Sequence, residues 1–135
     1  MSPRLTLLFL CNRVDSNAVF IPAFISAGFH LLIARHTEEA KTLLSSLDVD
    51  AIFIWHEGVS TLAGAELKHV TDQTPVILLS DESQGEQRPP GVDSVCQLDP
   101  RDEVLAFAVA MFFRQSLAAS RSNALAVMPG TGGKT

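Results

Sequence analysis

The sequence has few of the residues that mark folds held together by covalent bonds or metals. Cys11 and Cys96 are the only cysteines in 135 residues, too few for a disulfide framework or a four-ligand zinc site. Charged residues make up only 19% of the chain and apolar residues 47%, a balance that excludes intrinsic disorder. The chain is therefore expected to form one globular domain with a single buried core.

Basic residues and long apolar runs are also scarce. Ten lysines and arginines stand against fifteen acidic residues, so no basic surface for nucleic acid or anionic lipid is expected. The longest apolar stretch, residues 104–113, is too short to span a bilayer. The first residues lack the basic segment and apolar core of a secretory signal. These absences predict a cytoplasmic protein with neither a nucleic-acid nor a membrane partner.

Short apolar runs alternate with amphipathic segments. The runs have no polar face, which is typical of strands covered on both sides. Strands are expected at residues 4–11, 30–34, 51–55, 76–79 and 92–98. Apolar residues at helical spacing predict helices between these strands. Helices are expected at residues 19–27, from a cap at Thr37 through Leu47, at residues 60–70, and from Asp99-Pro100 to about Ala119.

The alternation of strands and helices predicts an α/β fold. Five β/α units are typical of a flavodoxin-like three-layer sandwich, with a five-stranded parallel sheet of order 2-1-3-4-5. Residues 81–92 contain two prolines and two glycines without apolar periodicity, so the fourth helix is expected to be short or missing. Residues 1–120 are expected to form the domain, and residues 121–135 a flexible C-terminal tail. Functional side chains are expected at the carboxyl ends of the strands.

Three segments carry a resemblance to a known family. Residues 27–34 read AGFHLLIA and are followed by Glu38-Glu39-Ala40, residues 49–54 read VDAIFI, and residues 75–80 read PVILLS. In their order and spacing these segments resemble the receiver domain of two-component response regulators, the chemotaxis-regulator-like domains. The resemblance covers about residues 4 to 119, and it implies a role in phosphorelay signal transduction.

The resemblance also implies which residues should carry phosphotransfer. Receivers hold Mg²⁺ with two acids after the first strand, accept phosphate on an aspartate after the third, and use a hydroxyl after the fourth and a lysine after the fifth. The corresponding residues here are Cys11, Asn12, Trp55, Ser80 and Asp99. Only Ser80 matches. The chain therefore resembles a degenerate receiver, or pseudo-receiver, that is not phosphorylated at the usual aspartate position, has no enzymatic activity and holds no metal or other cofactor.

The strand ends also carry a hypothesis of another class. Cys11, His56, Glu57 and Ser80 are expected at the carboxyl ends of the strands, where they would line the site of a sensor for a small ligand or a metal. Such a sensor would melt at a higher temperature when its ligand is added. Cys11 and His56 also form a potential thiolate pair, but the local signatures of cysteine enzymes are absent.

The last helix is apolar at every position from 104 to 113, whereas a surface helix needs only an apolar stripe. One face should cover the sheet. The other, expected to include Leu105, Val109, Phe112 or Phe113, should face water unless residues 84–92 or the tail cover it. An apolar patch of this kind usually marks an interface, so the sequence predicts a protein partner or, through this helix, a homodimer.

Overall fold

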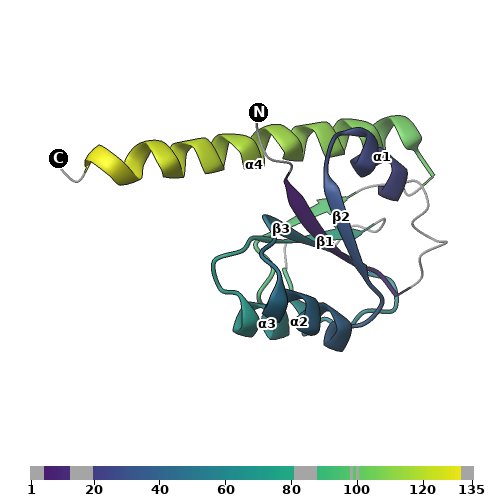
Figure 1. Cartoon of the computed structure of the whole chain (residues 1–135). Coiled ribbons are helices and arrows are strands. Elements are labelled where there is room, and N and C mark those ends of the chain that lie inside the picture. The colour runs from purple at the N-terminus through teal and green to yellow at the C-terminus, as the bar shows by residue number, and fades with distance from the viewer. Residues whose placement is uncertain (1–4, 13–19, 81–87, 98, 100, 132–135) are drawn as a thin grey trace.

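A five-stranded parallel sheet forms the centre of the molecule (Figure 1). The structure is a computed structural model that describes residues 5–12, 20–80, 88–97, 99 and 101–131, with side chains described up to residue 119. In chain order the elements are β1 (Thr6–Leu10), α1 (Phe20–Ser26), β2 (His30–Ala34), α2 (Thr37–Ser46), β3 (Ala51–Trp55), α3 (Ala63–Val70), β4 (Val76–Ser80), β5 (Ser94–Gln97) and α4 (Glu103–Thr131). The sheet order β2-β1-β3-β4-β5 confirms the predicted flavodoxin-like α/β class.

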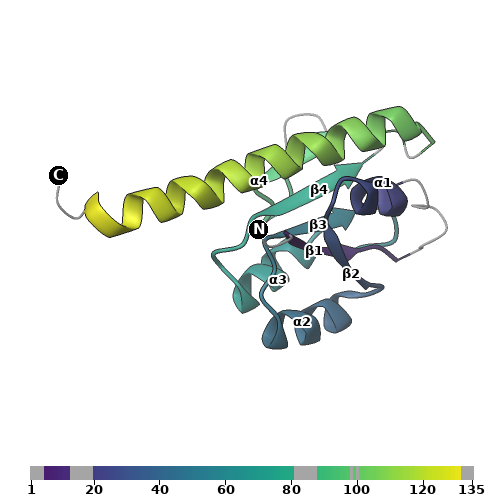
Figure 2. The ribbon, with the colours of Figure 1, turned by 45° about the horizontal axis from the view of Figure 1, so that its top comes forward.

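The strands divide their side chains between two apolar layers. Leu7, Phe9 and Phe53 point to the face covered by α1 and α4, while Leu8 and Ile52 point to the face covered by α2 and α3. This alternation follows from the two-residue period of a strand. Every residue of β3 and β4 is buried, which explains why these segments show no polar face in the sequence. Figure 2 shows the two helical layers on either side of the sheet.

Phe53 is the centre of the aromatic core on the α1/α4 face. Its ring stacks on Phe9 at a centroid distance of 5.6 Å and meets Phe24 of α1 edge-on at 5.2 Å. On the other side Phe113 of α4 approaches it edge-on at 4.9 Å. Each such pair adds roughly 0.5–1.5 kcal/mol beyond simple burial. Phe53 therefore ties both helices of this face to the sheet.

Helix α2 begins one residue earlier than the sequence suggests. His36, and not Thr37, is the N-cap, and its Nδ1 accepts a hydrogen bond from the Glu39 backbone N–H at 3.4 Å. The Glu39 carboxylate reaches back to the backbone N–H of Arg35. The predicted cap was therefore wrong by one residue, because the His36 nitrogen accepts the N–H that the Thr37 hydroxyl was expected to satisfy.

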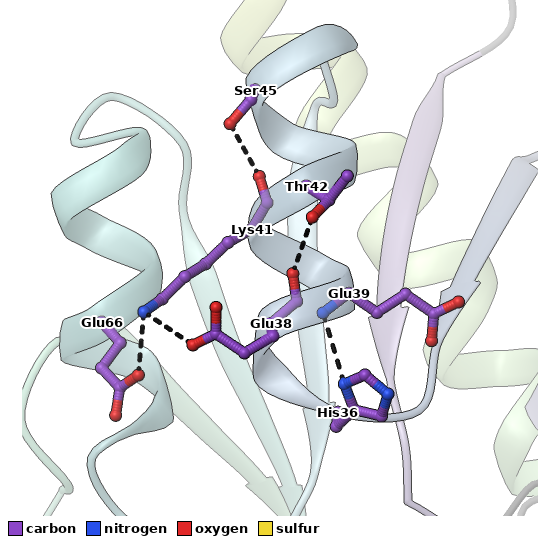
Figure 3. Close-up of polar contacts among 7 residues, drawn as sticks. All are labelled: His36, Glu38, Glu39, Lys41, Thr42, Ser45 and Glu66. Atoms are coloured by element: carbon purple, nitrogen blue, oxygen red, sulfur yellow. Dashed lines mark hydrogen bonds and ion pairs between the residues drawn. The ribbon is translucent and has the colours of Figure 1, made fainter.

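Lys41 forms ion pairs that link α2 to α3 (Figure 3). Its Nζ lies 3.1 Å from the Glu66 carboxylate on α3 and 3.3 Å from that of Glu38 on α2. Hydrogen bonds with Glu66 and then Glu38 raise the pKa of Lys41. The group is exposed, so this bridge orients the two helices and adds little to stability.

No helix forms among the described residues between β4 and β5, residues 88–93; residues 81–87 lie outside the described part. In place of a helix, a turn at Pro90-Gly91 packs on the first turn of α3, and Val92 is buried in the α2/α3 layer. This agrees with the expectation that the fourth helix is short or missing.

Helix α4 differs from the prediction at both ends. It begins at Glu103, because the Asp102 carboxylate accepts the backbone N–H of Leu105 at 3.0 Å and so caps the helix in place of Asp99. It continues to Thr131, so the end expected near Ala119 is wrong. Residues 120–128 contain neither glycine nor proline, and nothing in this stretch stops a helix. The domain boundary at residue 120 and the flexibility of the tail stay predictions.

The helix projects past the sheet in both views (Figures 1 and 2). Among the described residues, no helix combines the length and the apolar character needed to cross a membrane.

Asp93 contacts both the start of β4 and the end of α3. Its Oδ2 lies 2.8 Å from Lys68 Nζ and accepts the backbone N–H of Val76 at 2.8 Å. Lys68 also donates to the Thr74 carbonyl at 3.0 Å. Burial alone raises the pKa of Asp93, but the hydrogen bonds from Lys68 and Val76 and the charges of Lys68 and Arg88 outweigh it, so the pKa lies below its usual value.

Because the pKa of Asp93 is lowered, we expect the domain to lose a small part of its free energy of unfolding in acid. Because the pKa is lower in the folded chain, the stabilisation is present above the unfolded-state pKa near 3.8 and is lost as the pH falls through the lower, folded value. Asp93 is half exposed, so we expect less than about 1 kcal/mol. Urea denaturation of wild type and Asp93→Asn between pH 2.5 and 6 measures this contribution. The difference between their free energies of unfolding should shrink toward low pH. A difference independent of pH would contradict the assignment.

Candidate functional site

The carboxyl ends of β1, β3 and β4 meet at one edge of the sheet. Leu10 pairs with Ile54, Trp55 pairs with Leu79, and Ser80 pairs with Gln97. This register brings Cys11, Trp55 and Ser80, each at or next to the end of its strand, to the same edge, as the sequence predicted.

Trp55 is buried at this edge of the sheet. Its side chain is 1% exposed and belongs to the core layer under α1 and α4. The ring lies 5.1 Å from that of Phe20 on α1 and 4.9 Å from that of His56. The indole N–H points to the Glu57 carboxylate at 3.5 Å. An apolar ring therefore fills the position at which the resemblance places the phosphoacceptor.

Cys11 and Ser80 flank Trp55 and are both buried without exposed surface. Cys11 belongs to the same core layer as Trp55, and its backbone N–H continues the sheet by donating to the Ala34 carbonyl at 2.9 Å. Neither side chain reaches solvent, so both contribute to the packing of the strand ends.

Asn12 and Asp99 lie at the surface. Asn12 packs against the loop after β3, where a side chain on Gly58 would come within 3.0 Å of the Asn12 amide. The Asp99 carboxylate accepts the backbone N–H of Arg101 at 2.9 Å and its guanidinium N–H at 3.3 Å. Hydrogen bonds from this backbone N–H and then from the Arg101 side chain hold the pKa of Asp99 below its usual value. The position at which the resemblance places a receiver's lysine thus carries a carboxylate.

One of the four residues of the sensor hypothesis, His56, lines a pocket of about 230 Å³. Cys11, Glu57 and Ser80 are not among the lining residues of this pocket. Within the described part of the chain, no three His, Cys, Asp or Glu side chains are grouped so that they would hold a metal ion. Of the residues that line this pocket the sequence analysis singled out only His56, because the others are apolar or hydroxyl-bearing and come from distant segments.

The outer face of α4 agrees only in part with the expectation. Phe112 is 62% exposed and Leu105 is also exposed, whereas Val109 and Phe113 pack against the core. Val109 and Phe113 are only partly exposed, since both pack against the core and the ring of Phe113 lies against Phe53. Val104 and Phe107 are exposed and were missed.

A groove runs between α4 and the edge strand β5. Its volume is about 660 Å³, and it is lined by Ser94, Val95, Cys96, Gln97, Ala108, Val109, Phe112 and Phe113. Burial raises the pKa of the Cys96 thiol. An apolar groove beside exposed aromatic residues is typical of a protein-binding surface.

Comparisons with known proteins give a structural likeness only. No protein-family model and no curated protein matches the sequence. The response regulator TrrA of Thermotoga maritima, solved in complex with Mg²⁺-BeF, is 17% identical at a TM-score of 0.66, covering 84% of this chain and 98% of its own. A CheY-like receiver domain from Methanospirillum hungatei is 10% identical at 0.69, covering 90% and 99%.

An orphan response regulator of Helicobacter pylori is 14% identical at a TM-score of 0.67, covering 85% of this chain and 99% of its own. At identities this low, the structural likeness establishes the backbone arrangement alone. The chemistry has to be argued from the side chains. The chain has the fold of the response regulator receiver domains.

Proposed function

We propose that this chain is a cytoplasmic, non-enzymatic pseudo-receiver, a signalling domain that acts through protein–protein contacts and self-associates as a homodimer through α4. The observation that carries the proposal is the buried Trp55 at the end of β3. An indole ring has no oxygen to accept a phosphoryl group. The receiver domains among the structural neighbours support a signalling role.

The residues that correspond to a receiver's acids and lysine also argue against phosphotransfer. A phosphoryl group on an aspartate needs a hard cation held by carboxylates and a positive side chain beside its oxygens. Asn12 stands at one of the acid positions, and Asp99 with its lowered pKa stands where a lysine is required. An anion here would meet a negative charge where a receiver supplies a positive one.

The surface for association is the outer face of α4 next to β5. Phe112 contributes the most exposed aromatic ring of this face and lines the groove beside β5. Exposed aromatic side chains next to a groove are typical anchors of interfaces. A second copy of the chain would bury Phe112 together with Leu105, which lies two turns earlier on the same side of the helix and is also exposed.

The sensor hypothesis keeps one observation in its favour, the pocket beside His56. For a metal sensor no such support exists within the described part of the chain, since no three potential metal ligands are grouped there.

Phe112→Glu is expected to weaken self-association at least tenfold, or by about 1.4 kcal/mol, because it places a charge in the apolar contact. The stability of the monomer should change by less than about 1.5 kcal/mol, since Phe112 is 62% exposed and loses only its edge-on contact with Phe113. Light scattering coupled to size exclusion, over a range of concentrations, measures the association. Gln73→Glu is the matched control, because it adds the same charge at an exposed position outside α4.

The same experiment is run with Mg²⁺ and acetyl phosphate. The proposal expects a dimer whose mass and elution do not respond to either. A wild-type chain that is monomeric at every concentration would contradict the homodimer. A change of mass or elution on adding the phosphoryl donor would contradict the pseudo-receiver.

A further inference from the structure

A pocket opens at the carboxyl end of the sheet, on the face covered by α2 and α3. The buried side chains of Ile54 on β3 and Leu78 on β4 line it from the sheet, and Val92 lines it from the turn before β5. His56, Ser60 and Thr61, in the loop between β3 and α3, supply its polar groups. The pocket lies over the part of the sheet next to which the described residues 88–93 form a turn instead of a helix.

The walls of this pocket are held in place by close backbone packing. A side chain on Gly64 would come within 2.9 Å of Val92 Cγ2 and 3.0 Å of the Pro90 carbonyl. Gly64 itself lines the pocket. The turn before β5 is therefore locked on the first turn of α3, and the space between them does not require a moving segment to form. A preformed site binds a ligand without the loss of entropy that ordering a loop requires.

The lining determines which molecules fit. Most lining residues are apolar, and none is Lys, Arg, Asp or Glu, so a charged ligand would lose its hydration without gaining an ion pair. Ser60 Oγ accepts the backbone N–H of Leu62 at 3.0 Å, and its own O–H is a donor. A volume of about 230 Å³ exceeds the roughly 150 Å³ of an apolar cavity that holds benzene.

From these features we propose that the pocket binds a small, neutral, single- or double-ring molecule with one hydrogen-bonding group, of the size of phenol or indole. The ring packs on Ile54 and Leu78, and the polar group meets the hydroxyls of Ser60 and Thr61 and the imidazole of His56. The proposal goes beyond the association through α4 and does not depend on it, since α4 lies on the opposite face of the sheet.

Phenol and indole are titrated into the full chain while the backbone amide signals are followed by NMR. We expect saturable shifts at residues 54–64, 78 and 92, with a dissociation constant of roughly 0.1–10 mM, as the efficiency of small ligands suggests. Leu78→Phe should weaken binding at least tenfold, because the larger ring fills the space. Val109→Phe should leave binding unchanged, because it adds the same kind of bulk in the groove beside α4.

If Leu78→Phe does not fold, Val92→Leu makes the same test with a smaller change of volume. Shifts that do not saturate up to the solubility of the probes would overturn the proposal. So would shifts centred on β5 and α4 that Val109→Phe abolishes and Leu78→Phe leaves intact. Dimerisation measured on the same samples keeps this test separate from the test of the α4 interface.

Discussion

Trp55→Asp is expected to unfold the domain without making it a phosphoacceptor. The substitution removes a ring that is 1% exposed and packs on Phe20 at 5.1 Å, and loss of a buried large aromatic residue destabilises by about 3–5 kcal/mol. It also leaves a carboxylate in an apolar layer, where an unpaired charge is strongly disfavoured. The sum exceeds about 5 kcal/mol, which is the whole stability of many small domains.

Urea denaturation followed by circular dichroism measures this loss, and a phosphate-affinity gel after incubation with acetyl phosphate and Mg²⁺ measures phosphorylation. Trp55→Phe is the matched control. It keeps an aromatic ring in the layer but loses the hydrogen bond from the indole N–H to Glu57, so we expect it to cost about 1–2 kcal/mol. A folded Trp55→Asp variant that takes up phosphate would show that the edge retains receiver chemistry.

The sheet was predictable because its strands are buried on both sides. β3 and β4 are completely buried, so their sequences contain continuous apolar runs, which are typical of strands covered on both faces. The order of the strands followed from the alternation with helices. The same regularity brought Cys11, Trp55 and Ser80 to one edge, since parallel strands end on the same side of the sheet.

The details of α4 were less predictable, for a physical reason. Residues 104–113 are apolar on every side, so their sequence does not mark which face turns toward the sheet. That choice depends on how α4 crosses the sheet, and the contact of Phe113 with Phe53 decides it through tertiary packing. The start at Glu103 likewise depends on which of two aspartates, Asp99 or Asp102, caps the helix.

The pocket beside His56 could not be predicted from local patterns at all. It depends on the turn before β5 packing on α3, and the two glycines that permit this contact, Gly64 and Gly91, are far apart in the chain. A sequence shows glycine at both positions but not that they meet.

Gly91→Ala is expected to destabilise the domain by about 3 kcal/mol or more, because it disrupts this contact between the turn and α3. Gly91 has a φ of +79°, and a side chain there brings strain of about 1–2 kcal/mol. Its Cβ would also lie 2.5 Å from the Ala65 Cα and from the Gly64 carbonyl carbon. Both are backbone atoms of α3, so the turn has to separate from the helix to make room.

Two matched variants separate the causes in the same urea titration. Gly28→Ala tests strain alone, because φ is +101° there and the nearest atom, Arg114 Nε, is 3.9 Å from the added Cβ. Gly64→Ala tests crowding without backbone strain, because Gly64 has no positive φ; in α3 the crowding is partly offset by the higher helix propensity of alanine. We expect about 1–2 kcal/mol for the first and about 1 kcal/mol for the second. If Gly91→Ala destabilises no more than Gly28→Ala, the turn yields easily and does not form a fixed wall over β3 and β4.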